Sequence, residues 1–201
     1  MKNFSSAPPG VAGLLLAGGR STRMGRDKAQ LDWRGRPLGE HQAATLAATG
    51  AAPLHLSCRA DQPWTPANFA RLEDRRAGGG SLEALVEALT ALDAELTLVL
   101  AIDLPLVEPD WLAALAADAA RAKKSVVPFH ADRFEPLAAA WHRSALPELR
   151  RTLAQNRPLQ SACAALRAGA LLRPEKVDAE HAARLANLNT PAEAARFGCF
   201  A

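Results

Sequence analysis

A loop rich in glycine and basic residues near the N-terminus is the part of the chain best suited to bind a polyphosphate. It reads LAGGRSTRMGRDK over residues 16–28 and follows the apolar run Val11–Leu16. Glycine adopts positive φ readily and lets the backbone approach a ligand closely, and consecutive N–H groups in a tight turn form a concave anion site. Arg23 and Lys28 can neutralise phosphate charge there, the arginine as a planar fork and the lysine as a point charge.

Two other phosphate-binding motifs do not match this loop. The P-loop needs Gly-Lys followed by Ser or Thr, which occurs nowhere in the chain. The dinucleotide fingerprint GxGxxG is also excluded, because Gly18 and Gly19 are adjacent and the next glycine is Gly25. The alternative to a phosphate site is a glycine-rich turn between a strand and a helix, with its basic residues facing water.

The basic charge of the chain is concentrated around this loop. Six basic and only two acidic residues lie between Arg20 and Arg36, whereas the formal net charge of the whole chain is +3. This distribution favours a local anionic ligand, and a solvated basic surface is the alternative for Arg34 and Arg36. The small net charge gives no indication of a nucleic-acid partner.

A carboxylate that follows a predicted strand is a candidate metal ligand. Asp103 comes directly after the apolar run Leu96–Ile102 and shortly before Pro105. A carboxylate in that position suits Mg²⁺, which binds carboxylate oxygens together with substrate phosphates. The alternative is an aspartate that caps the following turn or helix.

Length and composition indicate one domain of an ordinary globular protein. The 201 residues are 49% hydrophobic and 22% charged. Cys58, Cys163 and Cys199 are widely spaced and odd in number, which indicates neither a disulfide framework nor a zinc site. No apolar stretch approaches the length of a membrane span. We therefore expect a cytoplasmic protein with no membrane contact and with a flexible N-terminal segment over residues 1–10.

Strand and helix signals alternate along the chain and predict a mostly parallel, Rossmann-like sheet in a single three-layer α/β/α domain over residues 1–201. The predicted strands are Val11–Leu16, Pro53–Ser57, Leu96–Ile102, Ser125–Phe129 and Leu137–Trp141, the last antiparallel to Ser125–Phe129. The predicted helices are Pro37–Thr49, Thr65–Leu72, a helix N-capped by Ser81, and Pro109–Arg121. In such sheets ligands bind beyond the carboxyl ends of the strands, where we expect the glycine-rich loop and Asp103 to meet.

The pattern LAGGxSxRMGxDK resembles the signature of sugar-phosphate-type nucleotidyltransferases. Its Asp27-Lys28 ending is most similar to that of the molybdenum cofactor guanylyltransferases. Asp103 in LAIDLPL matches a second position of that family, and Asp74, which precedes a glycine-rich segment, matches a third. The resemblance extends from Val11 to about Phe197 and implies the fold of the nucleotide-diphospho-sugar transferases.

The resemblance also implies roles for the matching residues. Arg23 and Lys28 would hold the β- and γ-phosphates and, with Asp103, would be catalytic. Asp103 would also bind Mg²⁺, and Asp74 would read the base. The residues that the resemblance places at the nucleotide are Leu16, Ala17, Gly18, Gly19, Lys28, Asp74 and Asp103.

Three further residues are candidates to support the acceptor or the metal. Asn187 and Asn189 lie in NLNTP, which resembles the family's C-terminal NxNTP, although Asn-Thr-Pro is also a common way to begin a helix. Arg157, in QNRPL, could clamp an acceptor phosphate. The segment Glu135-Pro136-Leu137 resembles a further family segment, and no ligand role is assigned to it.

Two segments depart from the family pattern. Residues 80–84 read GSLEA where GPLAG is expected, so the glycine turn is kept while the residues expected at the base are changed. Residues 56–59 read LSCR where the family commonly has an asparagine-containing segment, and no site residue is assigned there.

The reaction implied by the resemblance is the Mg²⁺-dependent transfer of GMP from GTP to the terminal phosphate of molybdopterin, with release of pyrophosphate. The expected partners are GTP and a molybdopterin-type phosphorylated acceptor, and proteins of molybdoenzyme maturation are a further candidate class. Three alternatives stay open: a related enzyme that uses CTP, one that uses another phosphorylated acceptor, and a non-catalytic nucleotide-binding protein that delivers the cofactor.

Overall fold

The fold is built on an eight-stranded sheet, seen in a computed structural model that describes residues 6–18, 27–74, 79–188, 193 and 199–200. Along the sheet the strands follow the order β10-β7-β9-β6-β1-β4-β5, and β8 pairs with β7. Their bounds are β1 Val11–Leu16, β4 Leu54–Cys58, β5 Phe69–Glu73, β6 Leu96–Ala101, β7 Ser125–His130, β8 Arg133–Phe134, β9 Ala138–His142 and β10 Leu172–Lys176. The pairs of β1 with β4 and β6, β4 with β5, and β7 with β10 are parallel, whereas β9 is antiparallel to both of its neighbours.

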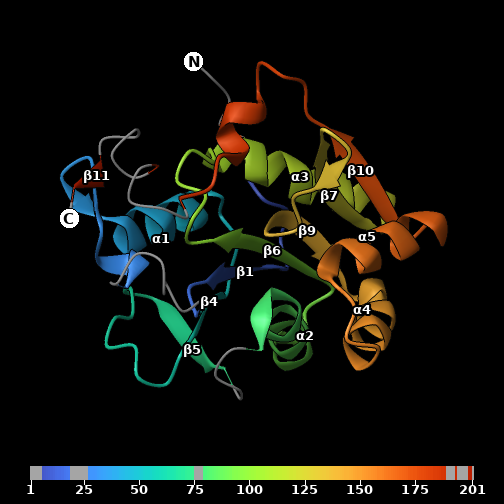
Figure 1. Cartoon of the computed structure of the whole chain (residues 1–201), viewed down its shortest axis with the longest axis horizontal. Helices are drawn as coiled ribbons and strands as arrows, with labels where there is room; N and C mark the ends of the chain where they lie inside the picture. The colour runs from blue at the N-terminus through green and yellow to red at the C-terminus, as the bar shows by residue number, and fades with distance from the viewer. Residues whose placement is uncertain (1–5, 19–26, 75–78, 189–192, 194–198, 201) are drawn as a thin grey trace.

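Helices cover both faces of this sheet, which gives three layers (Figure 1). One face carries α1 (Leu38–Ala48) and α3 (Pro109–Ala122). The other face carries α2 (Gly80–Leu92), α4 (Leu146–Ala154) and α5 (Leu159–Ala168). This arrangement confirms the predicted α/β/α class and its mostly parallel sheet.

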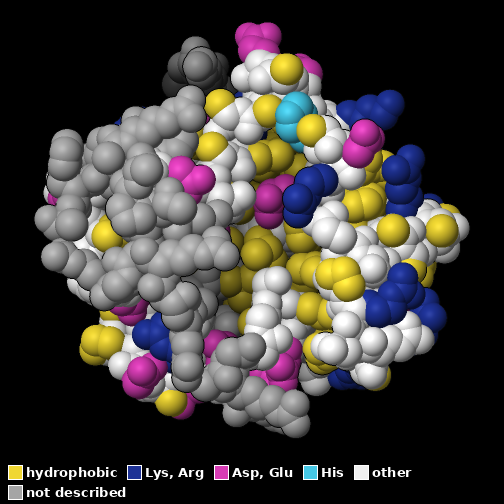
Figure 2. Space-filling view, viewed as in Figure 1, with side chains coloured by type: hydrophobic (Ala, Val, Ile, Leu, Met, Phe, Trp, Pro, Cys, Tyr) yellow, Lys and Arg dark blue, Asp and Glu magenta, His cyan; other side chains and the backbone are white. Residues whose placement is uncertain are grey.

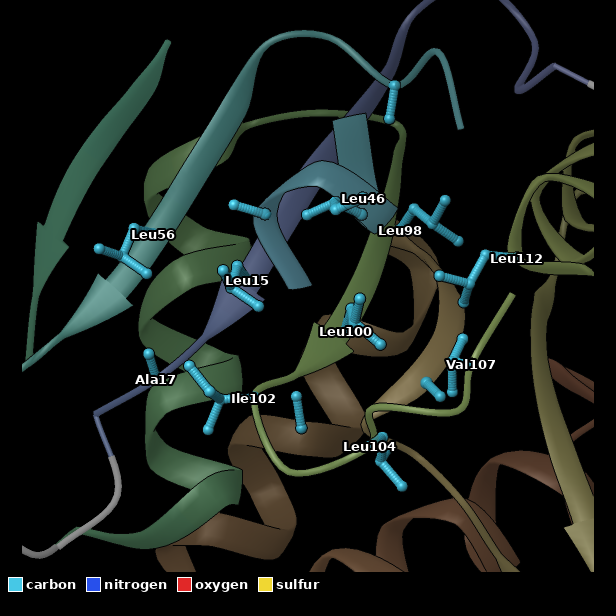
Figure 3. Packing of buried hydrophobic residues seen from close by; sticks show 14 of the residues in the cluster. Leu15, Ala17, Leu46, Leu56, Leu98, Leu100, Ile102, Leu104, Val107 and Leu112 are labelled. Atoms are coloured by element: carbon cyan, nitrogen blue, oxygen red, sulfur yellow. The ribbon is translucent and has the colours of Figure 1, made fainter. Parts of the chain in front are cut away.

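The two cores follow from the alternation of side chains along the central strands. Leu15, Leu98 and Leu100 face α1 and α3, where they pack with Leu46 and Leu112 (Figure 3). The intervening residues point to the opposite face and pack against α2, α4 and α5. Continuous apolar runs such as β1 and β6 are required here, because a strand covered by helices on both faces buries every side chain.

Short elements complete the described chain. A small sheet of β2 (Asp32–Trp33), β3 (Arg36–Pro37) and β11 (Cys199–Phe200) joins a C-terminal segment to the segment before α1. Three 3-10 turns lie at Lys28–Gln30 (η1), Arg143–Ala145 (η2) and Ala182–Leu185 (η3). At the N-terminal side, Ala7 is buried and its N–H donates to the carbonyl of Thr49. In the described residues no helix combines the length and the apolar character that crossing a bilayer needs.

Two sequence predictions are wrong. Residues 65–72 do not form a helix, because Asn68 adopts a left-handed conformation with φ of 66° and the chain then pairs as β5 in parallel with β4. Arg71 stabilises this path by donating to three carbonyls of the preceding loop, those of Arg59, Gln62 and Trp64. Ser81 does not cap α2, since that helix begins at Gly80 with Gly79 as its N-cap and no side-chain cap bond.

Candidate functional site

The site lies where the central strands β1 and β6 end side by side. Leu16 is in register with Ala101, and the N–H of Ile102 donates to the carbonyl of Leu16 at 3.0 Å. From β1 the chain proceeds through α1 to β4 and β5 on one side, whereas α2 leads to β6 on the other. The carboxyl ends of the neighbouring strands β1 and β6 therefore mark the topological switch point of the sheet, the place where open α/β sheets bind ligands.

Lys28 and Asp103 form an ion pair at the ends of these strands. Lys28 Nζ lies 3.2 Å from Asp103 Oδ2, and the two side chains are 14% and 22% exposed. Lys28 begins the turn η1, which Asp27 caps by accepting from the N–H of Ala29 at 3.0 Å. Gln62 Nε2 in turn donates to Asp27 at 3.3 Å. The loop after β4 thus supports the turn that aims Lys28 at Asp103.

The turn that carries Asp103 is held from α1. Gln42, fully buried, donates from Nε2 to the carbonyls of Ala101 at 2.8 Å and Leu104 at 3.1 Å, which flank Asp103 on both sides. His41 Nε2 reaches the Pro105 carbonyl at 2.9 Å. Since Arg36 can only donate to Nδ1 of this ring, Nε2 carries the proton of a neutral imidazole. Burial lowers the pKa of His41, which favours that neutral form.

Asp74 follows β5 and lies against the start of the glycine-rich loop. Its Oδ1 accepts a hydrogen bond from Ser57 Oγ at 2.9 Å, and its N–H donates to the Cys58 carbonyl at 2.9 Å. A Cβ atom placed on Gly18 would lie 2.0 Å from Asp74 Oδ2. A side chain at position 18 would therefore displace this carboxylate, which gives one described glycine of the loop a steric reason.

A cavity of about 620 Å³ opens on the neighbouring part of the sheet edge. Figure 2 shows a hollow near the middle of one face, with apolar side chains on its floor and an acidic and a basic side chain close together at its rim. The polar residues lining the cavity are Ser81, His130, Arg133, Glu135, Gln160 and Asn187.

Glu135 is the most perturbed acid of this cavity. Burial is the main cause that raises its pKa to about 7; a hydrogen bond from the Leu137 N–H opposes the rise, and the nearby Asp103 carboxylate adds to it. Asn187 donates a side-chain hydrogen bond to Glu135, and the next N–H, that of Leu188, donates to the Asp103 carbonyl at 2.8 Å. Glu135 and Asn187 therefore connect the cavity to Asp103 at the end of β6.

The structure brings most of the described candidate residues together. Leu16, Ala17, Gly18, Lys28, Asp74 and Asp103 lie at the ends of β1, β5 and β6 or on the turn η1, and Asn187 lies next to Asp103. Arg157 is exposed just after α4 and is not among the residues that line the cavity. Gly19, Arg23 and Asn189 lie outside the described residues.

Sequence reasoning did not assign roles to several residues of this edge. Gln42 shows no motif because it lies inside a predicted helix, and Ser57 lies in the segment LSCR, to which no site residue was assigned because it departs from the family pattern. Arg133 and His130 lie at the hairpin of β7 and β8, where no pattern indicated a site. For Glu135, the family-like EPL segment was the available signal.

This α/β domain carries a lysine–aspartate pair at its topological switch point and has a cavity nearby. These features define the class of nucleotide-binding α/β proteins. The family model of the MobA-like NTP transferase domain matches residues 13–171. The chain belongs to this family and is a nucleotidyltransferase.

Similar proteins cover almost the whole chain. A protein of Opitutus terrae named "Probable molybdenum cofactor guanylyltransferase" is 38% identical over 192 residues, which is 94% of this chain and 95% of that protein. The "Molybdenum cofactor guanylyltransferase" of Xanthomonas euvesicatoria is 34% identical and covers 92% of each chain. The crystal structure of molybdopterin-guanine dinucleotide biosynthesis protein A from Archaeoglobus fulgidus has a TM-score of 0.70 at 25% identity, covering 92% of this chain and 96% of that one.

The same fold occurs in a protein named as a cytidylyltransferase. The crystal structure of 2-C-methyl-D-erythritol 4-phosphate cytidylyltransferase from Thermus thermophilus has a TM-score of 0.68 at 15% identity, covering 91% of this chain and 95% of that one. The fold by itself therefore does not specify the base or the acceptor.

Proposed function

We propose that this chain transfers GMP from GTP to the terminal phosphate of molybdopterin in an Mg²⁺-dependent reaction and releases pyrophosphate. The observation that carries the proposal is the Lys28–Asp103 pair at the switch point, 3.2 Å apart and next to a cavity of about 620 Å³. Two relatives, 38% and 34% identical, carry the name of this activity. The pair suits a nucleotide phosphate, and the cavity has room for a separate acceptor.

The reaction needs positioning and charge neutralisation more than proton transfer. An oxygen of the acceptor phosphate forms a bond to the α-phosphorus of GTP, and the bond from that phosphorus to the oxygen bridging to the β-phosphorus breaks. Since the acceptor phosphate is already an anion, no general base is required. Lys28 offsets the negative charge that develops on the leaving pyrophosphate. We assign the same role to Arg23, and nucleotide contacts through backbone N–H groups to Gly18 and Gly19.

The donor set at the strand ends fits Mg²⁺. Asp103 supplies a carboxylate, and the neighbouring Asn187 supplies a neutral amide oxygen, both hard ligands that this ion prefers. Among the described residues no three His, Cys, Asp or Glu side chains gather into a metal cage, so the ion would share its shell with substrate phosphates. When bound, it would polarise the phosphoryl oxygens and neutralise their charge. Asn189 is a further proposed ligand.

Asp74 is the proposed reader of the base. An ionised carboxylate only accepts hydrogen bonds, and the N1–H and N2 amino groups of guanine present adjacent donors. Cytosine and adenine present a ring-nitrogen acceptor beside their amino group, which a carboxylate repels. This chemistry favours GTP over CTP, the substrate class of the alternative.

The cavity is the proposed acceptor site. Asn187 and Arg133 line it and can contact phosphate or other polar groups of the acceptor, while its apolar lining can contact a ring system. Arg157 lies next to Pro158, a residue of the lining, and would approach a bound acceptor from the rim. We further propose that proteins of molybdoenzyme maturation receive the product.

The test is pyrophosphate release from each of the four NTPs, with Mg²⁺ and a molybdopterin acceptor. We expect release with GTP and none when acceptor or Mg²⁺ is left out. Release with CTP alone would contradict the guanylyl assignment and keep the reaction class. Binding of nucleotide without release, from folded protein with acceptor present, would favour a delivery protein instead.

A further inference from the structure

We propose that Ser57 is a positioning residue for base selectivity, which acts by fixing the Asp74 carboxylate through its hydroxyl. The inference rests on the proposed function, because it concerns the base preference of the same site. Ser57 lies near the end of β4 and is only 2% exposed. Its Oγ donates to Asp74 Oδ1 at 2.9 Å.

The backbone around Ser57 ties together the ends of three strands. The carbonyl of Ser57 accepts from the N–H of Ala17, directly after β1, at 2.9 Å. The carbonyl of Cys58 accepts from the N–H of Asp74, directly after β5, at 2.9 Å. These backbone bonds hold the main chain of Asp74 in place beside β4. The hydroxyl of Ser57 then orients the carboxylate of Asp74.

The second carboxylate oxygen is constrained from the opposite side. Asp74 Oδ2 lies so close to Gly18 that a Cβ there would be 2.0 Å away. The bond from Ser57 to Oδ1 and the closeness of Oδ2 to Gly18 together restrict rotation of the carboxylate. A fixed orientation matters because a pair of parallel N–H···O bonds depends on the plane of the carboxylate.

Loss of the hydroxyl would therefore change selectivity more than it changes affinity for phosphate. A carboxylate free to rotate still repels ring-nitrogen acceptors, but it no longer holds both oxygens toward two adjacent N–H donors. The contact to the guanine N2 amino group is the one that separates GTP from ITP, which lacks that group. The ratio of the two dissociation constants thus measures the proposed role.

The experiment compares wild type with Ser57→Ala by calorimetric binding of GTP and ITP. We expect wild type to prefer GTP and the preference to fall about tenfold, towards one, in the variant, because a hydrogen bond to a charged group is removed. The matched control is Ser125→Ala, a fully buried serine of the same sheet whose Oγ accepts from the His142 N–H far from the site. The control should keep the wild-type ratio.

A double-mutant cycle separates positioning from general weakening. In an Asp74→Ala background, Ser57→Ala should leave the GTP to ITP ratio unchanged, because the group it orients is gone. An unchanged ratio in Ser57→Ala alone, or an equal fall in the Asp74→Ala background, overturns the inference. Should Ser57→Ala not fold, Ser57→Cys, which keeps the volume and donates weakly, serves for the same comparison.

Binding and turnover keep the two proposals apart. Equilibrium binding needs no acceptor, so the inference is decided even if no pyrophosphate is released from GTP. A wild type that binds GTP and ITP equally overturns the role of Ser57 directly. A wild type that prefers GTP in binding yet releases no pyrophosphate contradicts only the proposed reaction.

Discussion

Replacing Gly18 with alanine tests the close approach between the glycine-rich loop and Asp74. An added Cβ would lie 2.0 Å from Asp74 Oδ2, 3.0 Å from Cγ and 3.2 Å from Oδ1. Because real Cβ contacts essentially never fall below 3.0 Å, the carboxylate must move by about 1 Å at the least. We expect that movement to disturb the 2.9 Å bond that Ser57 donates to this carboxylate.

The expected magnitudes differ for folding and for binding. Disturbing one hydrogen bond to a charged, half-buried group should lower the free energy of unfolding by about 1–2 kcal/mol. A displacement of about 1 Å in a group that positions substrate can cost on the order of a hundredfold in catalytic efficiency. We therefore expect the Gly18→Ala variant to fold, with a small loss in the free energy of unfolding. Its kcat/KM for GTP should fall by about a hundredfold.

The assay combines urea unfolding with pyrophosphate release as a function of GTP concentration. Gly169→Ala is the matched control, because a Cβ there meets nothing closer than 3.4 Å and the residue has an ordinary φ of −79°. That control should match wild type in both measurements. If Gly18→Ala behaves like Gly169→Ala, Asp74 does not occupy the position beside the loop that the structure gives it.

Three further predictions concern the charged groups of the site. Lys28→Ala should reduce kcat/KM by about a hundredfold or more, while the free energy of unfolding falls by about 1–3 kcal/mol, because Asp103, only 22% exposed, loses a charged hydrogen-bond donor; normal steady-state turnover would contradict the phosphate role. Asp103→Asn should abolish activity at every Mg²⁺ concentration while circular dichroism stays that of wild type, and an unchanged Mg²⁺ titration would exclude this ligand. For Glu135 the pKa is raised from 4.5 to about 7 by folding, so the unfolded state loses its proton first and stability falls as pH rises through that interval. Glu135→Gln should therefore gain up to about 3 kcal/mol relative to wild type between about pH 4.5 and 7 in urea unfolding, and a pH-independent difference would show that the acid is not held neutral by burial.

Much of the fold could be predicted because its central strands are covered on both faces. Every residue of β1 and β6 is buried, so each strand reads as a continuous apolar run. The helix at 65–72 was wrong for a reason that the sequence does not show. Residues 69–73 pair with β4, and Arg71 bonds to carbonyls far back along the chain, so tertiary contacts override local preference there.

Several residues of the candidate site could be predicted from the sequence, but the contacts between them could not. The glycine-rich loop and Asp103 stand out because glycines, basic residues and a carboxylate follow predicted strands, and Asp74 stands out because it matches the family pattern before a glycine-rich segment. Ser57 carries no such signal, since a serine inside a predicted strand has many ordinary uses. Its role depends on β5 lying next to β4, which is a matter of strand order.

The amino-acid sequence alone is enough to identify the residue types of the proposed phosphate site, the alternation of strands and helices, and the family pattern. These are local properties, fixed by backbone preferences and by the burial of apolar runs. The contact between Lys28 and Asp103, 75 positions apart in the chain, and the closeness of Asp74 to Gly18 follow only from the three-dimensional structure. That structure also places Glu135 beside Asp103, where burial raises its pKa to about 7. Such contacts depend on strand order and register, which set distances between residues that no spacing in the sequence encodes.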